Sequence, residues 1–125
     1  ALVSFHLCDI TNRERVASLF AEYKPEIVFH AAAYKHVPVM ESNPAEAVSC
    51  NILGTKNLAD LAVAFKVRKF IMISTDKAVN PTSVMGCSKR IAEIYVQALN
   101  NHLLVTSTGR TMFVTTRFGN VLGSN

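Results

Sequence analysis

The chain has 125 residues, half of them apolar and 18% charged, a composition that predicts one compact globular unit and excludes a disordered chain. No apolar run approaches the roughly 18–20 residues of a membrane span and no signal peptide opens the chain, so we expect no membrane contact by this segment. The net charge of +4 comes from basic residues spread along the sequence, which argues against a nucleic-acid partner and suits a phosphate-bearing small ligand.

The first predicted elements are a strand, a helix and a second strand. Leu2 to Cys8 is largely apolar and predicts a buried strand. Thr11 and Glu14 have the spacing of a capping box, which predicts a helix from there to about Tyr23, before a Lys-Pro pair. Glu26 to His30 then predicts a short strand.

The middle of the chain predicts a loop, a long helix and a third strand. The residues from Ala31 to Ser42 are mostly small or polar and predict the loop. Asn43-Pro44 supplies an N-cap and a first-turn proline for a helix that runs to Lys66, interrupted by Gly54. Lys69 to Ser74 is apolar enough for a buried strand.

The last elements continue the alternation of strands and helices. After a loop from Thr75 to Val84, the apolar periodicity predicts a helix from Met85 to about Asn100. Met112 to Thr116 predicts a fourth strand, and Arg117 to Asn125 predicts a glycine-bearing loop. Apolar strands that alternate with helices are typical of an α/β fold with a parallel sheet covered by helices.

The three cysteines give no sign of a metal or disulfide framework. Cys8, Cys50 and Cys87 make an odd count, and no pair of them has a CxxC spacing. We therefore predict reduced, mostly buried thiols and no metal site.

Polar or small residues follow each predicted strand. In open α/β sheets, ligands bind beyond the carboxyl ends of the strands. We therefore expect four segments to converge on one site: Asp9-Ile10, His30 to His36, Ser74 to Lys77, and Arg117 to Asn120.

Two groups of residues could carry the chemistry of such a site. Thr75, Asp76 and Lys77 offer a hydroxyl, an acid and a base, which can polarise an alcohol, protonate a leaving group and remove a proton. A strand-end turn with a helix-capping role is the alternative. Met85 and Lys89 share one helix face because they are four residues apart, although a core methionine and a surface cation would have the same spacing.

The remaining candidates are less specific. The small side chains from Ala31 to Ala33 let a flat ligand approach the backbone, or they form a tight strand exit. Asp9 can accept a hydrogen bond from an adenine amino group, or it merely precedes a helix cap. Asn51 is a poor helix former in mid-helix, which indicates a buried polar contact. Arg117 and Asn120 could bind sugar or phosphate oxygens, or they form a loop ion pair.

The order of the motifs is similar to that of one family. It runs Asp-Ile, His-Ala-Ala-Ala-Tyr-Lys-His-Val-Pro, Asn-x-x-Gly-Thr, Ser-Thr-Asp-Lys-Ala-Val-Asn-Pro-Thr, Met-Gly-x-Ser-Lys-Arg and Arg-Phe-Gly-Asn-Val. These motifs resemble the extended short-chain dehydrogenase/reductases and, more narrowly, the CapD-like nucleotide-sugar 4,6-dehydratases of bacterial polysaccharide biosynthesis, which act on UDP-N-acetylglucosamine. The resemblance covers almost the whole chain and is most specific from Ser74 to Arg90.

The resemblance implies a Rossmann-like doubly wound sheet, a cofactor that is NAD or NADP, a UDP-sugar substrate and a homo-oligomer. It implies a cytoplasmic location, with membrane anchoring by other segments of the parent protein left open. The residues implied on the cofactor side are Asp9, Ile10, Ala31, Ala32, Ala33, Lys35, Asn51, Lys89 and Val121, and those on the substrate side are Lys35, Thr75 and Asn120.

The resemblance also implies a reaction. NAD(P)+ takes hydride from C4 of the sugar, water is eliminated across C5–C6, and hydride returns to C6. Thr75 would bind the 4-hydroxyl, Asp76 would act as acid towards the 6-hydroxyl, Lys77 would act as base at C5, and Lys89 would hold the nicotinamide ribose. The residues alone leave open which of Asp76 and Lys77 is the acid. The alternatives are a 4-epimerase of the same superfamily, which needs no acid–base pair at C5–C6, and a non-catalytic nucleotide-sugar binding protein.

Two features depart from the wider superfamily. Met85 stands where that superfamily has a tyrosine, and a thioether cannot donate a proton, so we expect Met85 only to shape the pocket of a methionine-containing subgroup. The five glycines never form the GxGxxG fingerprint. The predicted strands would be numbers 3 to 6 of the doubly wound order. We therefore expect residues 1–125 to be an internal fragment of one NAD(P)-binding Rossmann-like catalytic domain, without its first βαβ unit and C-terminal substrate region, and inactive in isolation.

Overall fold

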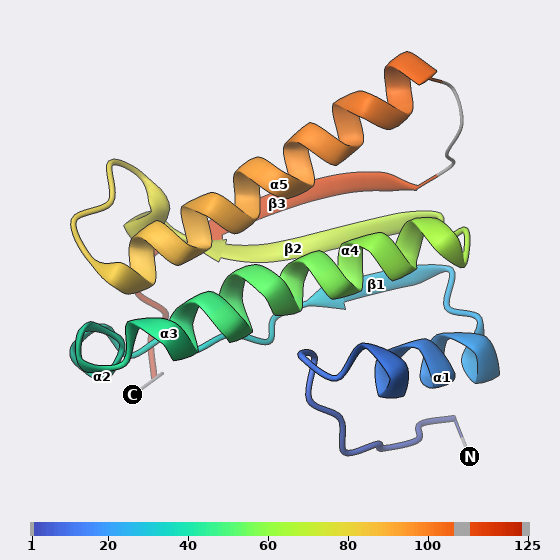
Figure 1. The fold of residues 1–125 in the computed structure, drawn as a ribbon, viewed down its shortest axis with the longest axis horizontal. Helices are drawn as coiled ribbons and strands as arrows, with labels where there is room; N and C mark the ends of the chain where they lie inside the picture. Colours follow the sequence, from blue (N-terminus) through green and yellow to red (C-terminus); the bar gives the residue numbers. More distant parts are fainter. Residues whose placement is uncertain (1, 107–110, 124–125) are drawn as a thin grey trace.

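The computed structural model describes residues 2–106 and 111–123, and in this part of the chain a parallel sheet carries helices on one face (Figure 1). The strands are β1 (Ile27–His30), β2 (Lys69–Thr75) and β3 (Met112–Phe118), in the spatial order β1-β2-β3. Both pairings are parallel. All three strand carboxyl ends therefore lie at the same edge of the sheet, and the predicted α/β class is confirmed.

The helices fill the connections between the strands. The helix α1 (Arg13–Tyr23) precedes β1. Four helical segments join β1 to β2, and two join β2 to β3. In chain order they are α2 (Val37–Ser42), α3 (Pro44–Ala47), the π-helix η1 (Val48–Gly54), α4 (Thr55–Ala64), the 3₁₀ turn η2 (Asp76–Ala78) and α5 (Val84–Thr106).

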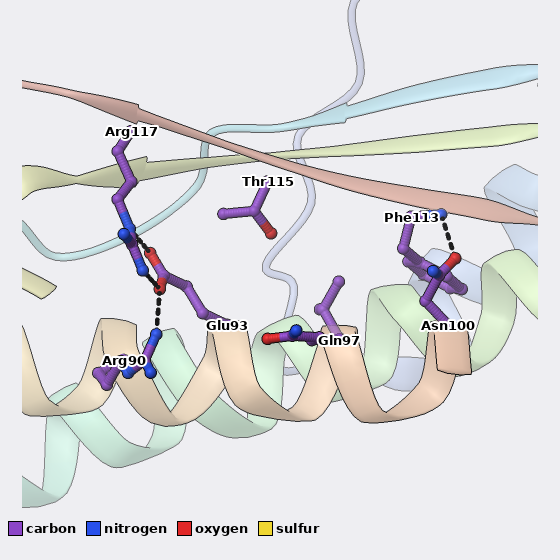
Figure 2. A pocket seen from close by; sticks show the side chains of 8 residues that line it. Arg90, Glu93, Gln97, Asn100, Phe113, Thr115 and Arg117 are labelled. Atoms are coloured by element: carbon purple, nitrogen blue, oxygen red, sulfur yellow. Dashed lines mark hydrogen bonds and ion pairs between the residues drawn. The ribbon is translucent and has the colours of Figure 1, made fainter. Parts of the chain in front are cut away.

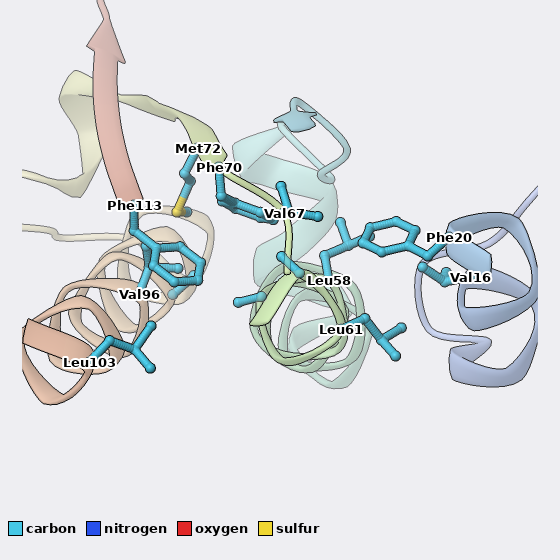
Figure 3. Close-up of a cluster of buried hydrophobic side chains, with 13 residues drawn as sticks. Val16, Phe20, Leu58, Leu61, Val67, Phe70, Met72, Val96, Leu103 and Phe113 are labelled. Carbon is cyan, nitrogen blue, oxygen red and sulfur yellow. The ribbon is translucent and has the colours of Figure 1, made fainter. Parts of the chain in front are cut away.

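The main core lies between the sheet and the helices α4 and α5 (Figure 3). Phe70 of β2 and Phe113 of β3 are both buried, and their ring centroids lie 5.2 Å apart. The helix α1 extends this core sideways, because Val16 and Phe20 pack in the same cluster beside α4 (Figure 3). The core therefore fixes α4 and α5 against the sheet, and the predicted site lies at the edge where the strands have their carboxyl ends.

The predicted strand at Leu2 to Cys8 is wrong. These residues form neither helix nor strand, and the side chains of Leu2, Phe5 and Leu7 are exposed. A strand needs a neighbour for its N–H and C=O groups, and β1 pairs only with β2 among the described strands. Phe29 of β1 is 72% exposed, so this apolar strand is not buried along its whole length.

The helix α1 ends as predicted, but its cap differs. Asn12, not Thr11, caps the helix, since its Oδ1 accepts a hydrogen bond of 3.0 Å from the Arg15 N–H. Thr11 is engaged elsewhere, because its N–H and hydroxyl both donate to the Asp9 carboxylate at 2.9 and 2.8 Å. Asp9 precedes the cap, as in the second of its two predicted roles, and its carboxylate also binds Thr11.

The loop and the long helix predicted between 31 and 66 are also corrected. The helix α2 lies inside the predicted loop, where Met40 is buried against α5. The long helix changes to π-helical hydrogen bonding over Val48–Gly54. The helix α5 and the strand β3 extend past their predicted ends, to Thr106 and Phe118. Residues 124–125 of the predicted last loop lie outside the described residues.

The thiols are less buried than predicted, since Cys8 and Cys50 are half-buried and Cys87 is exposed. Among residues 2–106 and 111–123, no group of three or more His, Cys, Asp or Glu side chains could hold a metal ion. In the same residues no helix has both the length and the hydropathy needed to cross a membrane.

Candidate active site

A cleft of about 490 Å³ lies at the carboxyl ends of the strands. Three of the four segments expected to converge do line it, from 31 to 36, 73 to 77 and 118 to 121, while Asp9-Ile10 does not. The cleft therefore confirms, for three of the strands, that the segments after their carboxyl ends converge on one site. The predicted site residues that line it are Ala31, Ala33, Lys35, Thr75, Lys77, Met85, Lys89, Asn120 and Val121.

Five predicted site residues lie outside the lining of the cleft: Asp9, Ile10, Ala32, Asn51 and Asp76. Ile10 borders the π-helix, because a Cβ on Gly54 would lie 2.6 Å from its Cδ1 atom. The Ile10 carbonyl also accepts a hydrogen bond of 3.1 Å from Asn57 in α4. A contact of Asp9 and Ile10 with adenine therefore stays a prediction about a surface other than this cleft.

The acid and the base predicted for the site lie next to each other at the end of β2. The Thr75 hydroxyl accepts a 3.2 Å hydrogen bond from the Lys77 N–H and so caps the 3₁₀ turn η2. The same hydroxyl donates to Asp76 Oδ1 at 3.2 Å, and Lys77 Nζ lies 3.5 Å from that oxygen. The structure therefore contains the predicted capping turn, and the same turn holds the carboxylate of Asp76 beside the ammonium group of Lys77.

Lys89 is a buried cation in the wall of the cleft. Its residue is only 5% exposed, and its Nζ donates a 2.9 Å hydrogen bond to the Ile73 carbonyl of β2. Burial lowers the pKa of Lys89, although the nearby Glu93 carboxylate acts in the opposite direction. Met85 and Lys89 both line the cleft, so the predicted shared helix face is confirmed, and the alternative of a surface cation is wrong.

Asn51 organises the wall behind the cleft. Its side-chain amide accepts a 2.9 Å hydrogen bond from the Tyr34 N–H and donates one of 3.1 Å to the Tyr34 carbonyl. The same amide nitrogen donates to Ser88 Oγ at 2.9 Å. Asn51 is completely buried, so the predicted buried polar contact is confirmed. It holds Tyr34, a residue of the cleft, against α5.

His30 supports the π-helix from the end of β1. The Thr55 hydroxyl donates a 2.7 Å hydrogen bond to the Asn51 carbonyl, so it must accept the 2.8 Å bond that joins it to His30 Nε2. His30 is therefore the neutral tautomer with its proton on Nε2. Its Nδ1 is buried without a hydrogen-bond partner in the part of the chain described. Burial and the nearby Lys89 cation lower the pKa of His30 to about 4.

We expect the His30 ring to remain neutral in the folded protein down to about pH 5. In the unfolded chain this imidazole takes up a proton near pH 6.5. The free energy of unfolding is therefore highest above that pH, and it falls by about 3 kcal/mol as the pH drops to 4, because only the unfolded state binds the proton. Ring ¹⁵N chemical shifts during a pH titration of the intact protein measure this directly. A midpoint for His30 above pH 6, or protonation of Nδ1 at neutral pH, would contradict it. The exposed His102 serves as the internal reference.

Met85 shapes the wall of the cleft from a small apolar cluster. It packs with Met40 and Ala47, and it is 3% exposed. It lines the cleft one helical turn before Lys89. Met85 is therefore a core residue and also part of the cleft wall, which agrees with both statements made about it from the sequence.

Glu93 binds two arginines on the inner side of α5 (Figure 2). Arg117 of β3 donates to Glu93 Oε1 at 3.1 Å and to Oε2 at 2.7 Å, and Arg90 donates to Oε2 at 3.2 Å. Burial alone would raise the pKa of Glu93, but the hydrogen bonds outweigh it and lower the pKa. Arg117 is therefore held in an ion pair, which was one of its two predicted roles. It lies in the strand β3, however, and not in the predicted loop.

The start of α5 is fixed by neighbouring segments. The Ser83 hydroxyl accepts a 3.0 Å hydrogen bond from the Gly86 N–H, and the Glu41 carboxylate of α2 accepts one of 2.6 Å from the Val84 N–H. Gly86 lies directly on the backbone of η2, since a Cβ there would be 2.3 Å from the Lys77 carbonyl oxygen. The first turn of α5 and the turn that holds Asp76 and Lys77 therefore share one contact.

Sequence reasoning missed four residues of the site: His30 as a support, Tyr34, Ser88 and Glu93. One signal could have found Glu93, because it continues the four-residue spacing of Met85 and Lys89 along one helix face. Tyr34 and Ser88 had no such signal, since their contacts with Asn51 join segments 17 and 37 residues apart.

Comparison with known families agrees with this architecture. Residues 1–125 match the family described as polysaccharide biosynthesis protein. The chain belongs to this family. The capsular polysaccharide biosynthesis protein CapD of Staphylococcus aureus is 55% identical over 118 residues, which cover 94% of this chain and 19% of that protein.

Two further relatives of the family carry enzyme names. A UDP-N-acetylglucosamine 4,6-dehydratase (inverting) of Campylobacter jejuni is 38% identical over 120 residues. These residues cover 96% of this chain and 34% of that protein. A UDP-glucose 4-epimerase of Rickettsia rickettsii is 40% identical, with 98% of this chain and 34% of that protein covered. The chain thus spans about a fifth to a third of the curated relatives it matches.

Solved structures agree on the fold. Pen from Bacillus thuringiensis superposes with a TM-score of 0.88 at 39% identity, over 95% of this chain and 35% of that one. The UDP-glucose 4-epimerase of Thermus thermophilus, solved as a complex with NAD, superposes with a TM-score of 0.79 at 25% identity, over 88% and 39% of the two chains. The sheet and its helices are therefore part of a Rossmann-like fold of the short-chain dehydrogenase/reductase type.

Proposed function

We propose that this chain is part of one NAD(P)-binding catalytic domain and carries the centre of a nucleotide-sugar 4,6-dehydratase acting on UDP-N-acetylglucosamine. The observation that carries the proposal is the Asp76–Lys77 pair, whose carboxylate and ammonium groups lie 3.5 Å apart beside the cleft. Elimination of water needs one proton removed at C5 and one delivered to the 6-hydroxyl. Two titratable groups at this spacing can serve both positions on neighbouring carbons of one sugar.

The neighbouring residues fit the remaining roles. Thr75 lines the cleft and can donate to the sugar 4-hydroxyl oxygen once a substrate replaces its bond to Asp76. Asn120 lines the same cleft and can offer its side-chain amide to the substrate. The Met85 thioether can neither ionise nor take up a proton at neutral pH, so removal of the 4-hydroxyl proton falls to Thr75, Asp76, Lys77 or water.

The cleft also fits the nicotinamide half of NAD or NADP. Ala31 and Ala33 give a wall without long side chains, and Lys89 supplies a buried cation that can hold two ribose hydroxyls. Lys35 and Val121 line the same cleft and can contact the cofactor near the substrate. When bound, the cofactor would accept a hydride from the sugar and return it. The chain's own residues orient both molecules and move the protons.

A 4-epimerase is the second candidate, because a UDP-glucose 4-epimerase is 40% identical to this chain. Epimerisation at C4 needs no proton transfer at C5 or C6. It would leave the Asp76–Lys77 pair without a use, and we therefore favour the dehydratase.

The reaction in D₂O separates these activities. The intact protein is incubated with UDP-N-acetylglucosamine and NAD+, and the product is followed by NMR. We expect a 4-keto-6-deoxy sugar with deuterium at C5, because the C5 proton is removed to the solvent-exchanging base and later replaced. A 4-epimer with hydrogen retained at C5 would assign the epimerase instead. Binding of the sugar nucleotide and cofactor without any product would support a non-catalytic protein.

We expect Asp76→Asn to lower kcat by about 100-fold, the lower part of the range for a proton-transfer group. The substitution keeps the size of the side chain but removes its ability to transfer a proton. The matched control is Asp60→Asn on α4, where Asp60 binds Lys56 and Tyr95 outside the cleft. The assignment would be wrong if Met85→Ala abolished turnover while Asp76→Asn left it intact.

A further inference from the structure

The Glu93 carboxylate joins two elements that each contribute to the cleft. Glu93 follows Lys89 by four residues on α5, and it is only 4% exposed. Its bidentate partner Arg117 belongs to β3, on the other side of the space between helix and sheet (Figure 2). A carboxylate this deeply buried is stable only with such partners, so the pair sets a fixed distance between α5 and the end of β3.

The strand end that Arg117 anchors leads directly into the cleft. In the β2–β3 ladder, Arg117 is the partner of Ser74, and Phe118 is the partner of Thr75. The next residues, from 119 to 121, line the cleft, and Gly119 lies near the carboxylate that the proposed reaction uses. A Cβ on Gly119 would be 3.7 Å from Asp76 Oδ2.

Arg90 differs from Arg117 in what it connects. Both arginine side chains are 42% exposed, and both donate to Glu93. Arg90 lies three residues before Glu93 on the same helix, so its bond joins α5 only to itself. Arg117 gives Glu93 two hydrogen bonds and Arg90 gives one, and of these two arginines only Arg117 belongs to the sheet.

We propose that Glu93 and Arg117 form a positioning pair, which holds residues 118–120 against η2 and so sets the substrate side of the cleft. The held segment contains Asn120, the residue proposed to meet the substrate, whereas Ala31, Ala33 and Lys89 of the proposed nicotinamide side belong to other segments. The pair should therefore act on the substrate more than on the cofactor. The effect on the strand end follows from the contacts alone. The effect on a sugar nucleotide rests on the proposed function.

The test compares Arg117→Gln with Arg90→Gln in the intact protein. Amide hydrogen exchange measures the local stability of the end of β3 without any ligand. We expect Arg117→Gln to raise the exchange rate at residues 117–118 about tenfold or more, because the strand end opens more easily without its ion pair. Calorimetric affinity for UDP-N-acetylglucosamine should fall about tenfold in the same variant, since small displacements of positioning residues carry large costs. The affinity for NAD+ should stay within about twofold. Arg90→Gln should change none of the three by more than about twofold.

Rescue separates positioning from general destabilisation. Arg117→Lys keeps a cation that can give Glu93 one hydrogen bond, so it should recover part of the lost affinity and protection, whereas Arg117→Gln should not. Equal behaviour of the Arg90 and Arg117 variants would overturn the proposal, as would equal losses of affinity for cofactor and sugar nucleotide. If the unmodified protein fails to bind the sugar nucleotide, the proposed function fails, and amide exchange still decides whether the pair positions the strand end.

Discussion

Replacement of Lys89 by methionine is expected to lower kcat/KM by about 10³-fold, the loss typical of a preorganised charged donor in a closed site. Lys89 holds its ammonium group in the wall of the cleft through one hydrogen bond to the Ile73 carbonyl. In the proposed dehydratase this cation binds the cofactor ribose and lowers the pKa of nearby proton donors. Methionine has a similar length, so the wall keeps its shape and loses only the charge.

The same substitution should leave the thermal midpoint unchanged or raise it. Burial lowers the pKa of Lys89, which means that the folded state holds this proton less tightly than the unfolded chain. The charged lysine therefore costs stability at neutral pH, and the cost disappears when an apolar side chain takes its place. Function and stability should thus move in opposite directions at this position.

Steady-state kinetics and thermal denaturation of the intact protein measure both effects. Lys56→Met is the matched control, because Lys56 lies on the outer side of α4 and its side chain is 49% exposed. A clear fall in the thermal midpoint of Lys89→Met would show that the ammonium group is needed for the fold. Turnover close to that of the unmodified protein would remove Lys89 from the proposed chemistry.

The sequence predicted the parts of the site that depend on local patterns. Each of the segments Ser74 to Lys77 and His30 to His36 follows an apolar run that forms a strand, and parallel pairing brings those ends together. The i, i+4 spacing of Met85 and Lys89 correctly placed both on the side of α5 that faces the cleft. These inferences needed only periodicity and the common direction of the strands.

The parts that could not be predicted depend on contacts between distant segments. The π-helix around Asn51 is fixed by the hydrogen bond from Thr55 and by the support from His30, 25 residues before Thr55. The strand predicted at Leu2 to Cys8 depends on a neighbouring strand, and periodicity gives no information on whether one is present. Arg117 could equally have bound a ligand, because only the fold brings Glu93 within 2.7 Å of it.

Replacement of Gly86 by alanine is expected to displace the turn that carries Asp76 and Lys77. The added Cβ would lie 2.3 Å from the Lys77 carbonyl oxygen and 3.2 Å from its carbonyl carbon. These are backbone atoms, which cannot turn away as a flexible side chain can. Either α5 or η2 must therefore move, at a cost of about 3 kcal/mol for an overpacked site.

Because both elements line the cleft, this movement should damage activity as well as stability. We expect kcat/KM to fall by about 100-fold or more, the loss that follows when catalytic groups shift by about 1 Å. Gly119→Ala is the matched control, since its Cβ would meet only Asp76 Oδ2, at an ordinary contact distance of 3.7 Å. It adds the same methyl group beside the Asp76 carboxylate, where no backbone atom of the described residues, its chain neighbours aside, lies within 4 Å. Equal losses in the two variants would show that crowding around Asp76, and not the contact between α5 and η2, limits the site. A Gly86→Ala protein with unchanged thermal midpoint and turnover would show that α5 and η2 can separate without consequence, and would remove this contact as the feature that holds Asp76 and Lys77 in place.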